Sequence, residues 1–130
     1  AFSIHEPGIT ARTAALAAYR HGERWLDELI SVLTGHADMM EQYFSQEIPG
    51  ARFIRPEASF IAFIDTSEIE QRLGSDQDLV NLLGTKGGIG LHRGSWFGRA
   101  GRGFVRINFG TPTSVLEDAL KRFKGTVKAI

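Results

Sequence analysis

The feature that most constrains this chain is a single charge inside an apolar strand. The strand reads Phe-Val-Arg-Ile-Asn-Phe over residues 104–109, and Gly-Ser-Trp-Phe-Gly over residues 94–98 precedes it. Successive residues of a strand point to opposite faces, so Phe104, Arg106 and Asn108 share one face and Val105, Ile107 and Phe109 the other. The pattern predicts a strand with one face in the core and Arg106 fixed on the opposite face. A guanidinium held in this way has N–H donors already oriented to bind both oxygens of a carboxylate.

Length and composition favour one globular domain over residues 1–130. The 130 residues can bury roughly two thirds of the surface that the unfolded chain exposes. Fifteen basic and fifteen acidic residues cancel, so no overall field attracts nucleic acid or an anionic membrane. The chain has no cysteine and no apolar run near the ~18 residues of a membrane span, which favours a soluble, cytoplasmic protein.

Periodicity predicts helices at both ends of the chain and strands between them. A first helix is expected over Thr10–Tyr19, and a long amphipathic helix from about Trp25 to Phe44, before Pro49. Strands follow over 51–65, with a bend at Pro56, then two helices from 67 to about 86. A strand over 89–92, the Arg106 strand and a helix from 112 complete the chain. The order predicts the α+β class, with a mixed or antiparallel sheet of about three to four strands covered by helices.

Local charge is more informative than the total. Residues 79–116 contain no Asp or Glu, yet five basic residues lie among them: Lys86, Arg93, Arg99, Arg102 and Arg106. A small carboxylate or phosphate ligand, an RNA backbone, or acidic residues elsewhere in the protein could each supply the matching anion. For every one of the five except Arg106, an acidic residue of the same protein is the favoured partner.

Other recognisable motifs are weak. Residues 102–109 begin like the strand motif of RNA-recognition domains, but the fifth position, which should stack on a base, is Arg106. The four histidines lack a metal-binding spacing, and no serine lies in a nucleophile-elbow context. The residues therefore predict neither a metal site nor nucleic-acid binding.

Three longer runs carry a resemblance to a known family. They are Gly-Glu-Arg-Trp-Leu-Asp-Glu-Leu over 22–29, the segment 49–65, and residues 94–112 with the Arg106 strand. In order and spacing they resemble the C-terminal part of pyridoxal-phosphate (PLP) enzymes of aminotransferase class I/II, closest to the cystathionine beta-lyase or C-S lyase branch. The resemblance implies the small C-terminal domain of a fold-type I PLP-dependent transferase. It also implies that the chain is a C-terminal fragment of a longer enzyme, with residues 1–21 as the connecting helix region.

The resemblance also implies roles for particular residues. Arg106 corresponds to the arginine that binds the substrate α-carboxylate. Trp96 and Phe97 are expected either to form part of the side-chain pocket wall or to cap the core as loop aromatics. The family's Schiff-base lysine and main PLP-binding residues lie in a larger domain that these 130 residues do not match. No catalytic, cofactor-binding or metal-binding residue is therefore expected in this fragment, which is predicted to be inactive alone. Its lysines, Lys86, Lys121, Lys124 and Lys128, are expected to be solvated.

For the intact enzyme the resemblance implies a PLP-dependent C-S β-lyase acting on an amino acid like cystathionine. Such an enzyme eliminates a thiol and yields pyruvate and ammonia. A class I/II aminotransferase is the alternative, and a non-catalytic carboxylate-binding module is a second alternative. The family also implies a cytoplasmic homodimer that binds an amino-acid substrate, with no nucleic-acid or membrane partner.

Overall fold

The computed structural model describes residues 7–73 and 76–130, and forms two compact units, Ala1–Val32 and Leu33–Ile130. Within the first unit, α1 (Ile9–His21) has no buried residue. Helix α2 (Glu23–Glu47) begins in the first unit and ends in the second, where it buries His36, Ala37, Met40 and Phe44. Both helices confirm the elements expected from periodicity, but the apolar stripe of α2 is only partly covered. Trp25 is 66% exposed, whereas Met40 and Phe44 are buried.

The second unit is built on a four-stranded antiparallel sheet in the order β1-β2-β4-β3. The strands are β1 (Arg52–Ile54), β2 (Ile61–Asp65), β3 (His92–Arg93) and β4 (Phe104–Asn108). Strands β1 and β2 form a hairpin around the bend at Pro56, and β4 lies between β2 and β3. The α+β prediction, with an antiparallel sheet, is confirmed.

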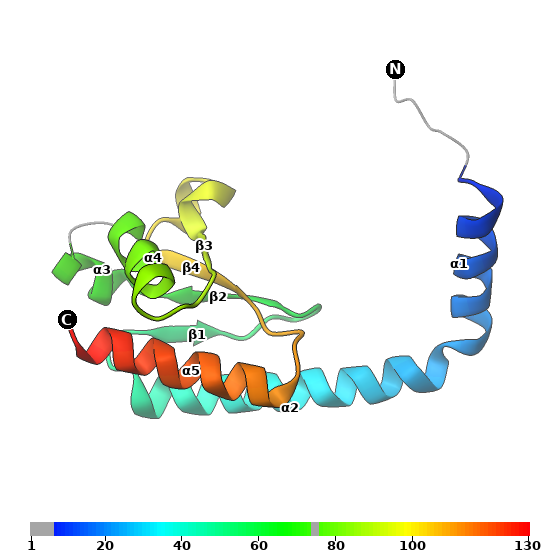
Figure 1. Ribbon diagram of the computed structural model, residues 1–130, viewed down its shortest axis with the longest axis horizontal. Helices are drawn as coiled ribbons and strands as arrows, with labels where there is room; N and C mark the ends of the chain where they lie inside the picture. Colours follow the sequence, from blue (N-terminus) through cyan, green and yellow to red (C-terminus); the bar gives the residue numbers. More distant parts are fainter. Residues whose placement is uncertain (1–6, 74–75) are drawn as a thin grey trace, which may run out of the picture. The chain divides into compact units, whose positions relative to one another are not determined.

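Helices close one face of this sheet. In Figure 1, α2 and α5 (Thr113–Lys128) lie along one side of the sheet, and the loop between β3 and β4 lies on the other. The core contains Phe44, Phe53, Ile64, Val105, Ile107, Phe109, Leu120 and Phe123. The alternation in β4 confirms that Val105, Ile107 and Phe109 face the core, since they are at most 5% exposed.

Two shorter helices, α3 (Ser67–Leu73) and α4 (Asp76–Thr85), separate β2 from β3. The predicted strand over 89–92 is wrong in extent, because Ile89 to Leu91 lie outside the sheet and β3 begins at His92. Gly88 has a φ of +64°, so the chain turns there and begins to pair with the sheet only at His92. The last helix begins one residue after Pro112, which is its N-cap.

A buried histidine connects α2 to the turn after β4. His36 is 3% exposed, with Nδ1 3.1 Å from the carbonyl oxygen of Phe109 and Nε2 2.9 Å from the Thr113 hydroxyl. A carbonyl can only accept, so Nδ1 carries the proton and donates it, and Nε2 accepts from Thr113. Both ring nitrogens of His36 are therefore satisfied by structural contacts.

Candidate functional site

Arg106 lies in the middle of the sheet, on the face opposite the core. It is directly paired with Phe63 of β2 on one side and with His92 of β3 on the other. Phe63 is paired in turn with Ile54 of β1, so these four side chains form a row across the sheet. Arg106 is half-buried, and its strand neighbours Val105 and Ile107 are buried on the other face. The core therefore fixes the backbone from which the guanidinium projects.

One aromatic ring contacts the Arg106 guanidinium, and two others contact that ring. Its Cζ atom lies 5.0 Å from the centroid of the Phe97 ring, within cation–π range. The Phe97 ring meets Phe63 edge to face, with centroids 5.8 Å apart and planes at 87°. His92 lies 6.4 Å from Phe97 on the other side. The Phe97 ring therefore lies at the guanidinium, and Phe63 of β2 and His92 of β3 lie beside that ring.

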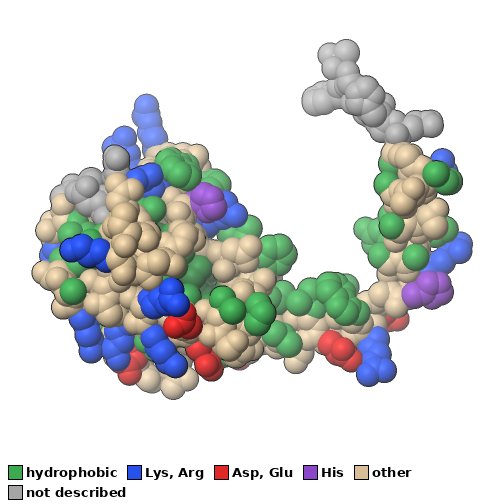
Figure 2. Space-filling model, viewed as in Figure 1, with side chains coloured by type: hydrophobic (Ala, Val, Ile, Leu, Met, Phe, Trp, Pro, Cys, Tyr) green, Lys and Arg blue, Asp and Glu red, His purple; other side chains and the backbone are tan. Residues whose placement is uncertain are grey.

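No carboxylate neutralises Arg106 in the part of the chain that the structure describes. The ion pairs found there involve Arg24, Arg52, Arg55, Arg122 and Lys124, and none of the five basic residues of segment 79–116. On the face shown in Figure 2, basic side chains (blue) project near the loop between β3 and β4, and both basic and acidic (red) side chains lie along α5. A half-buried guanidinium without an acidic partner keeps its in-plane N–H donors available for an external anion.

Trp96 makes different contacts from Phe97. Its ring lies 5.4 Å from the Arg93 guanidinium and 5.7 Å from the His92 ring, and the residue is 62% exposed. Arg93 also donates from Nη2 to Asn81 Oδ1 of α4 at 2.9 Å. Trp96 therefore forms the outer edge of the aromatic group, and Phe97 is the member that touches Arg106.

Close backbone packing fixes the loop that carries both rings. Two short 3-10 turns, η1 (Gly94–Phe97) and η2 (Arg99–Gly101), fold against each other. A Cβ on Gly94 would lie 2.2 Å from the Gly101 carbonyl oxygen, and one on Gly101 would lie 2.1 Å from that of Gly94. Neither position has room for a side chain. The glycines thus determine the path that brings Phe97 over Arg106.

The site contains two neighbours that the sequence did not single out as site residues. Phe63 and His92 contribute through strand pairing across β2, β4 and β3. The β2 segment was predicted as a strand, but its register relative to Arg106 follows from tertiary pairing. Of the residues predicted for the site, Arg106, Trp96 and Phe97 lie in one group, and only Phe97 contacts the guanidinium.

The described residues do not form a site for PLP. That cofactor needs an amine for its aldehyde and partners for its pyridine nitrogen and phosphate. Lys86, Lys121 and Lys128 are exposed, and Lys124 is hydrogen-bonded to Glu47 of α2. This hydrogen bond raises the pKa of Lys124, which keeps its amine protonated. In the described ranges, no group of His, Asp or Glu is arranged to hold a metal ion.

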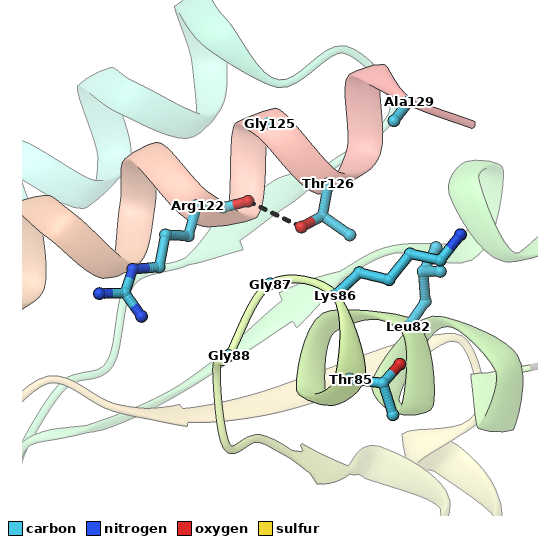
Figure 3. A pocket seen from close by; sticks show the side chains of 9 residues that line it. All are labelled: Leu82, Thr85, Lys86, Gly87, Gly88, Arg122, Gly125, Thr126 and Ala129. Carbon is cyan, nitrogen blue, oxygen red and sulfur yellow. Dashed lines mark hydrogen bonds between the residues drawn. The ribbon is translucent and has the colours of Figure 1, made fainter.

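A hollow lies away from Arg106, between the end of α4 and the end of α5. It has a volume of about 630 Å³, and Figure 3 shows Lys86, Arg122 and Thr126 around it. Arg122 is already paired with Asp118 at 2.6 Å, and Thr126 donates to the Arg122 carbonyl. Because the C-terminal ends of two helices meet here, their dipoles disfavour an anion. Arg106 is not part of this hollow.

Comparison with known proteins identifies similar enzymes. No family model matches the chain. Cystathionine beta-lyase PatB of Bacillus subtilis is 35% identical over 117 residues, covering 90% of this chain and 30% of that protein. A PLP-bound C-S lyase structure from Staphylococcus hominis matches 87% of this chain and 29% of its own, with TM-score 0.81 and 26% identity.

An alanine aminotransferase structure from Pyrococcus furiosus also matches, with a TM-score of 0.82 and 27% identity, over 95% of this chain and 31% of its own. The chain thus spans about 30% of the length of the curated relative named above. The resemblance inferred from the three sequence runs is confirmed by both sequence and fold. Over about nine tenths of its length, the chain is similar to the C-terminal part of PLP-dependent C-S lyases and class I/II aminotransferases.

Proposed function

We propose that this chain is the substrate-carboxylate-binding domain of a PLP-dependent C-S β-lyase, with Arg106 as the carboxylate-binding residue. The observation that carries the proposal is the half-buried Arg106 guanidinium, fixed on the open face of the sheet with no acidic partner in the described residues. The α-carboxylate of an amino acid matches its N–H donors in charge and geometry. Similarity to cystathionine beta-lyase PatB supports the lyase assignment.

The contribution of this domain is orientation. Two-point binding of a carboxylate by a rigidly held guanidinium fixes the α-carbon in one direction and lowers the entropic cost of reaction. The Phe97 ring covers part of the Arg106 guanidinium, and partial removal from water strengthens an ion pair. Trp96 and Phe97 stand at the rim, where we place the substrate side chain. PLP would supply the electron sink and would be bound mainly by residues outside this chain. The fragment alone should therefore be inactive.

The overall reaction proposed for the whole enzyme is elimination of a thiol from a cystathionine-like amino acid, with pyruvate and ammonia as the other products. Transfer of the amino group to a keto acid is the second candidate, favoured by the match to an alanine aminotransferase structure. A non-catalytic carboxylate-binding module is the third.

Homodimerisation and a cytoplasmic location are further parts of the proposal, supported by family resemblance. Among the described helices, none has the length and apolar character needed to cross a membrane.

The test is Arg106→Leu in the full-length enzyme that contains this chain, assayed with cystathionine. Loss of a charge-paired contact predicts a fall in kcat/KM of at least about 30-fold. Arg106→Lys should recover only part of the loss, because an ammonium lacks the planar fork. Arg102→Leu is the matched control, since Arg102 is an exposed arginine of the same segment, and its kcat/KM should stay near wild type.

The same assay separates the candidate reactions. Pyruvate and free thiol formed without an added keto acid support the lyase, whereas strict dependence on a keto acid supports the aminotransferase. Turnover and amino-acid affinity that survive Arg106→Leu unchanged would remove the basis of the proposal.

A further inference from the structure

We propose that Phe97 is a positioning residue, which holds the Arg106 guanidinium in the orientation that receives the substrate carboxylate. The inference rests on the function proposed above. Its starting point is the distance of 5.0 Å between Arg106 Cζ and the centroid of the Phe97 ring. This ring is the only cation–π partner of Arg106 in the described residues, and no hydrogen bond or ion pair competes with it there.

An arginine in this place needs such a contact. Its side chain has several rotatable bonds, and fixing them only when substrate arrives costs conformational entropy. Strand β4 fixes the Arg106 backbone, and pairing fixes its neighbours Phe63 and His92. The end of the side chain is still free to rotate unless something holds the guanidinium. The Phe97 ring under the guanidinium carbon restrains the end of the side chain, and a phenyl ring carries no conventional hydrogen-bond acceptor, so N–H donors stay available for the carboxylate.

Phe97 is itself held in place on two sides. Phe63 meets its ring edge to face at 5.8 Å, and His92 lies 6.4 Å away. The Gly94 and Gly101 backbones are packed too tightly for any side chain, so the loop that carries Phe97 has little room to shift. Phe97 is nevertheless 52% exposed, which indicates that it contributes little to the folded core. Because Phe97 is rigidly placed but little buried in the core, it is better suited to orient Arg106 than to stabilise the fold.

Trp96, the adjacent ring, differs in a way that provides a control. It contacts Arg93 and His92 and is 62% exposed, and it makes no cation–π contact with Arg106 among the described residues. Trp96 and Phe97 are thus similarly exposed, but their rings contact two different arginines, Arg93 and Arg106. If aromatic bulk at the rim were all that mattered, replacing either ring should have the same kind of effect.

The test compares two ligands in the full-length holoenzyme: L-alanine, and L-alaninamide, in which a neutral amide replaces the carboxylate. Calorimetric titration gives a dissociation constant for each, and their ratio measures carboxylate preference. Phe97→Leu should reduce that preference by between about 2-fold and about 30-fold, the range expected for loss of one cation–π contact, because it weakens alanine binding by a larger factor than alaninamide binding. Phe97→Tyr keeps the ring face and should restore the preference.

The remaining outcomes are distinct. Trp96→Leu should change the two ligands by the same factor. If Arg106→Leu abolishes the preference and Phe97→Leu leaves it at the wild-type value, the positioning role is wrong and the proposed function stands. If Phe97→Leu weakens the binding of both ligands by the same factor, the positioning role is also wrong, and Phe97 is only part of the pocket wall. If Arg106→Leu itself keeps the preference, the proposed function fails. Phe97→Met, a second apolar replacement without a ring, repeats the test if the leucine variant has a lowered melting temperature.

Discussion

At the scale of single residues, Asp65 connects the open face of the sheet to the next helix. One carboxylate oxygen accepts from the Ser67 amide at 3.1 Å and from its hydroxyl at 2.7 Å. The other accepts from Arg52 Nη2 at 3.0 Å, across the β1–β2 pair. Burial acts to raise the pKa of Asp65, but the Ser67 hydrogen bonds and the Arg52 charge outweigh it and lower the pKa below its ordinary value of 3.8.

This lowered pKa makes a prediction about pH. A carboxylate with a depressed folded-state pKa stabilises the protein fully above the unfolded pKa, and the effect is lost as the pH falls through the folded pKa. Asp65→Asn should therefore destabilise the protein by about 0.5–1 kcal/mol at pH 7, because Arg52 is mostly exposed and the pair is screened. The difference from wild type should shrink as the pH falls below 3.8. Urea unfolding from pH 7 to pH 2.5 measures it, and a difference that stays constant with pH would contradict the assignment.

At the scale of elements, the loop formed by η1 and η2 depends on two glycines. A Cβ at Gly94 would lie 2.2 Å from the Gly101 oxygen and 2.6 Å from the Phe104 oxygen, and both are backbone atoms that cannot move aside cheaply. Gly94→Ala should therefore displace the loop and lower the unfolding free energy by about 2 kcal/mol or more. In NMR spectra, the ring signals of Phe97 should shift with it.

Gly90→Ala is the matched control for this prediction. A Cβ there has no atom within 4 Å, and the backbone is not in the left-handed region. Its unfolding free energy should stay within about 0.5 kcal/mol of wild type. Equal behaviour of the two variants would show that the loop tolerates a side chain and does not fix Phe97.

Sequence periodicity predicted the elements better than their contacts. The alternation of Val105, Ile107 and Phe109 placed Arg106 on the open face, because strand geometry leaves no other choice. The contact of Phe97 with Arg106 was not predictable, since it depends on backbone packing between Gly94 and Gly101. Periodicity also placed Trp25 on an apolar stripe, but it cannot tell what covers a stripe, and Trp25 is 66% exposed.

At the scale of the whole molecule, the buried apolar side chains of the described residues all lie between Ala37 and Val127. The unit Leu33–Ile130 therefore contains the core that sets the stability of this chain. Helix α1 buries nothing, although Ile9 and Leu16 are apolar, with exposures of 77% and 50%. A helix without buried residues gains little from packing and has only its own propensity to keep it folded.

Removal of residues 1–22 should therefore leave the melting temperature of the 130-residue chain within about 2 °C of its original value, because α1, the described helix in the deleted part, buries no residue. A variant that begins at Gln42 is the contrasting deletion. It loses His36, Ala37 and Met40, and with them both hydrogen bonds to the turn after β4 and a fully buried side chain. Loss of such groups costs several kcal/mol, of the order of the whole stability of a domain this size, so this variant should not unfold cooperatively. Thermal unfolding followed by circular dichroism distinguishes the two deletions. A large fall in melting temperature on removal of residues 1–22 would mean that α1 takes part in the folded core after all.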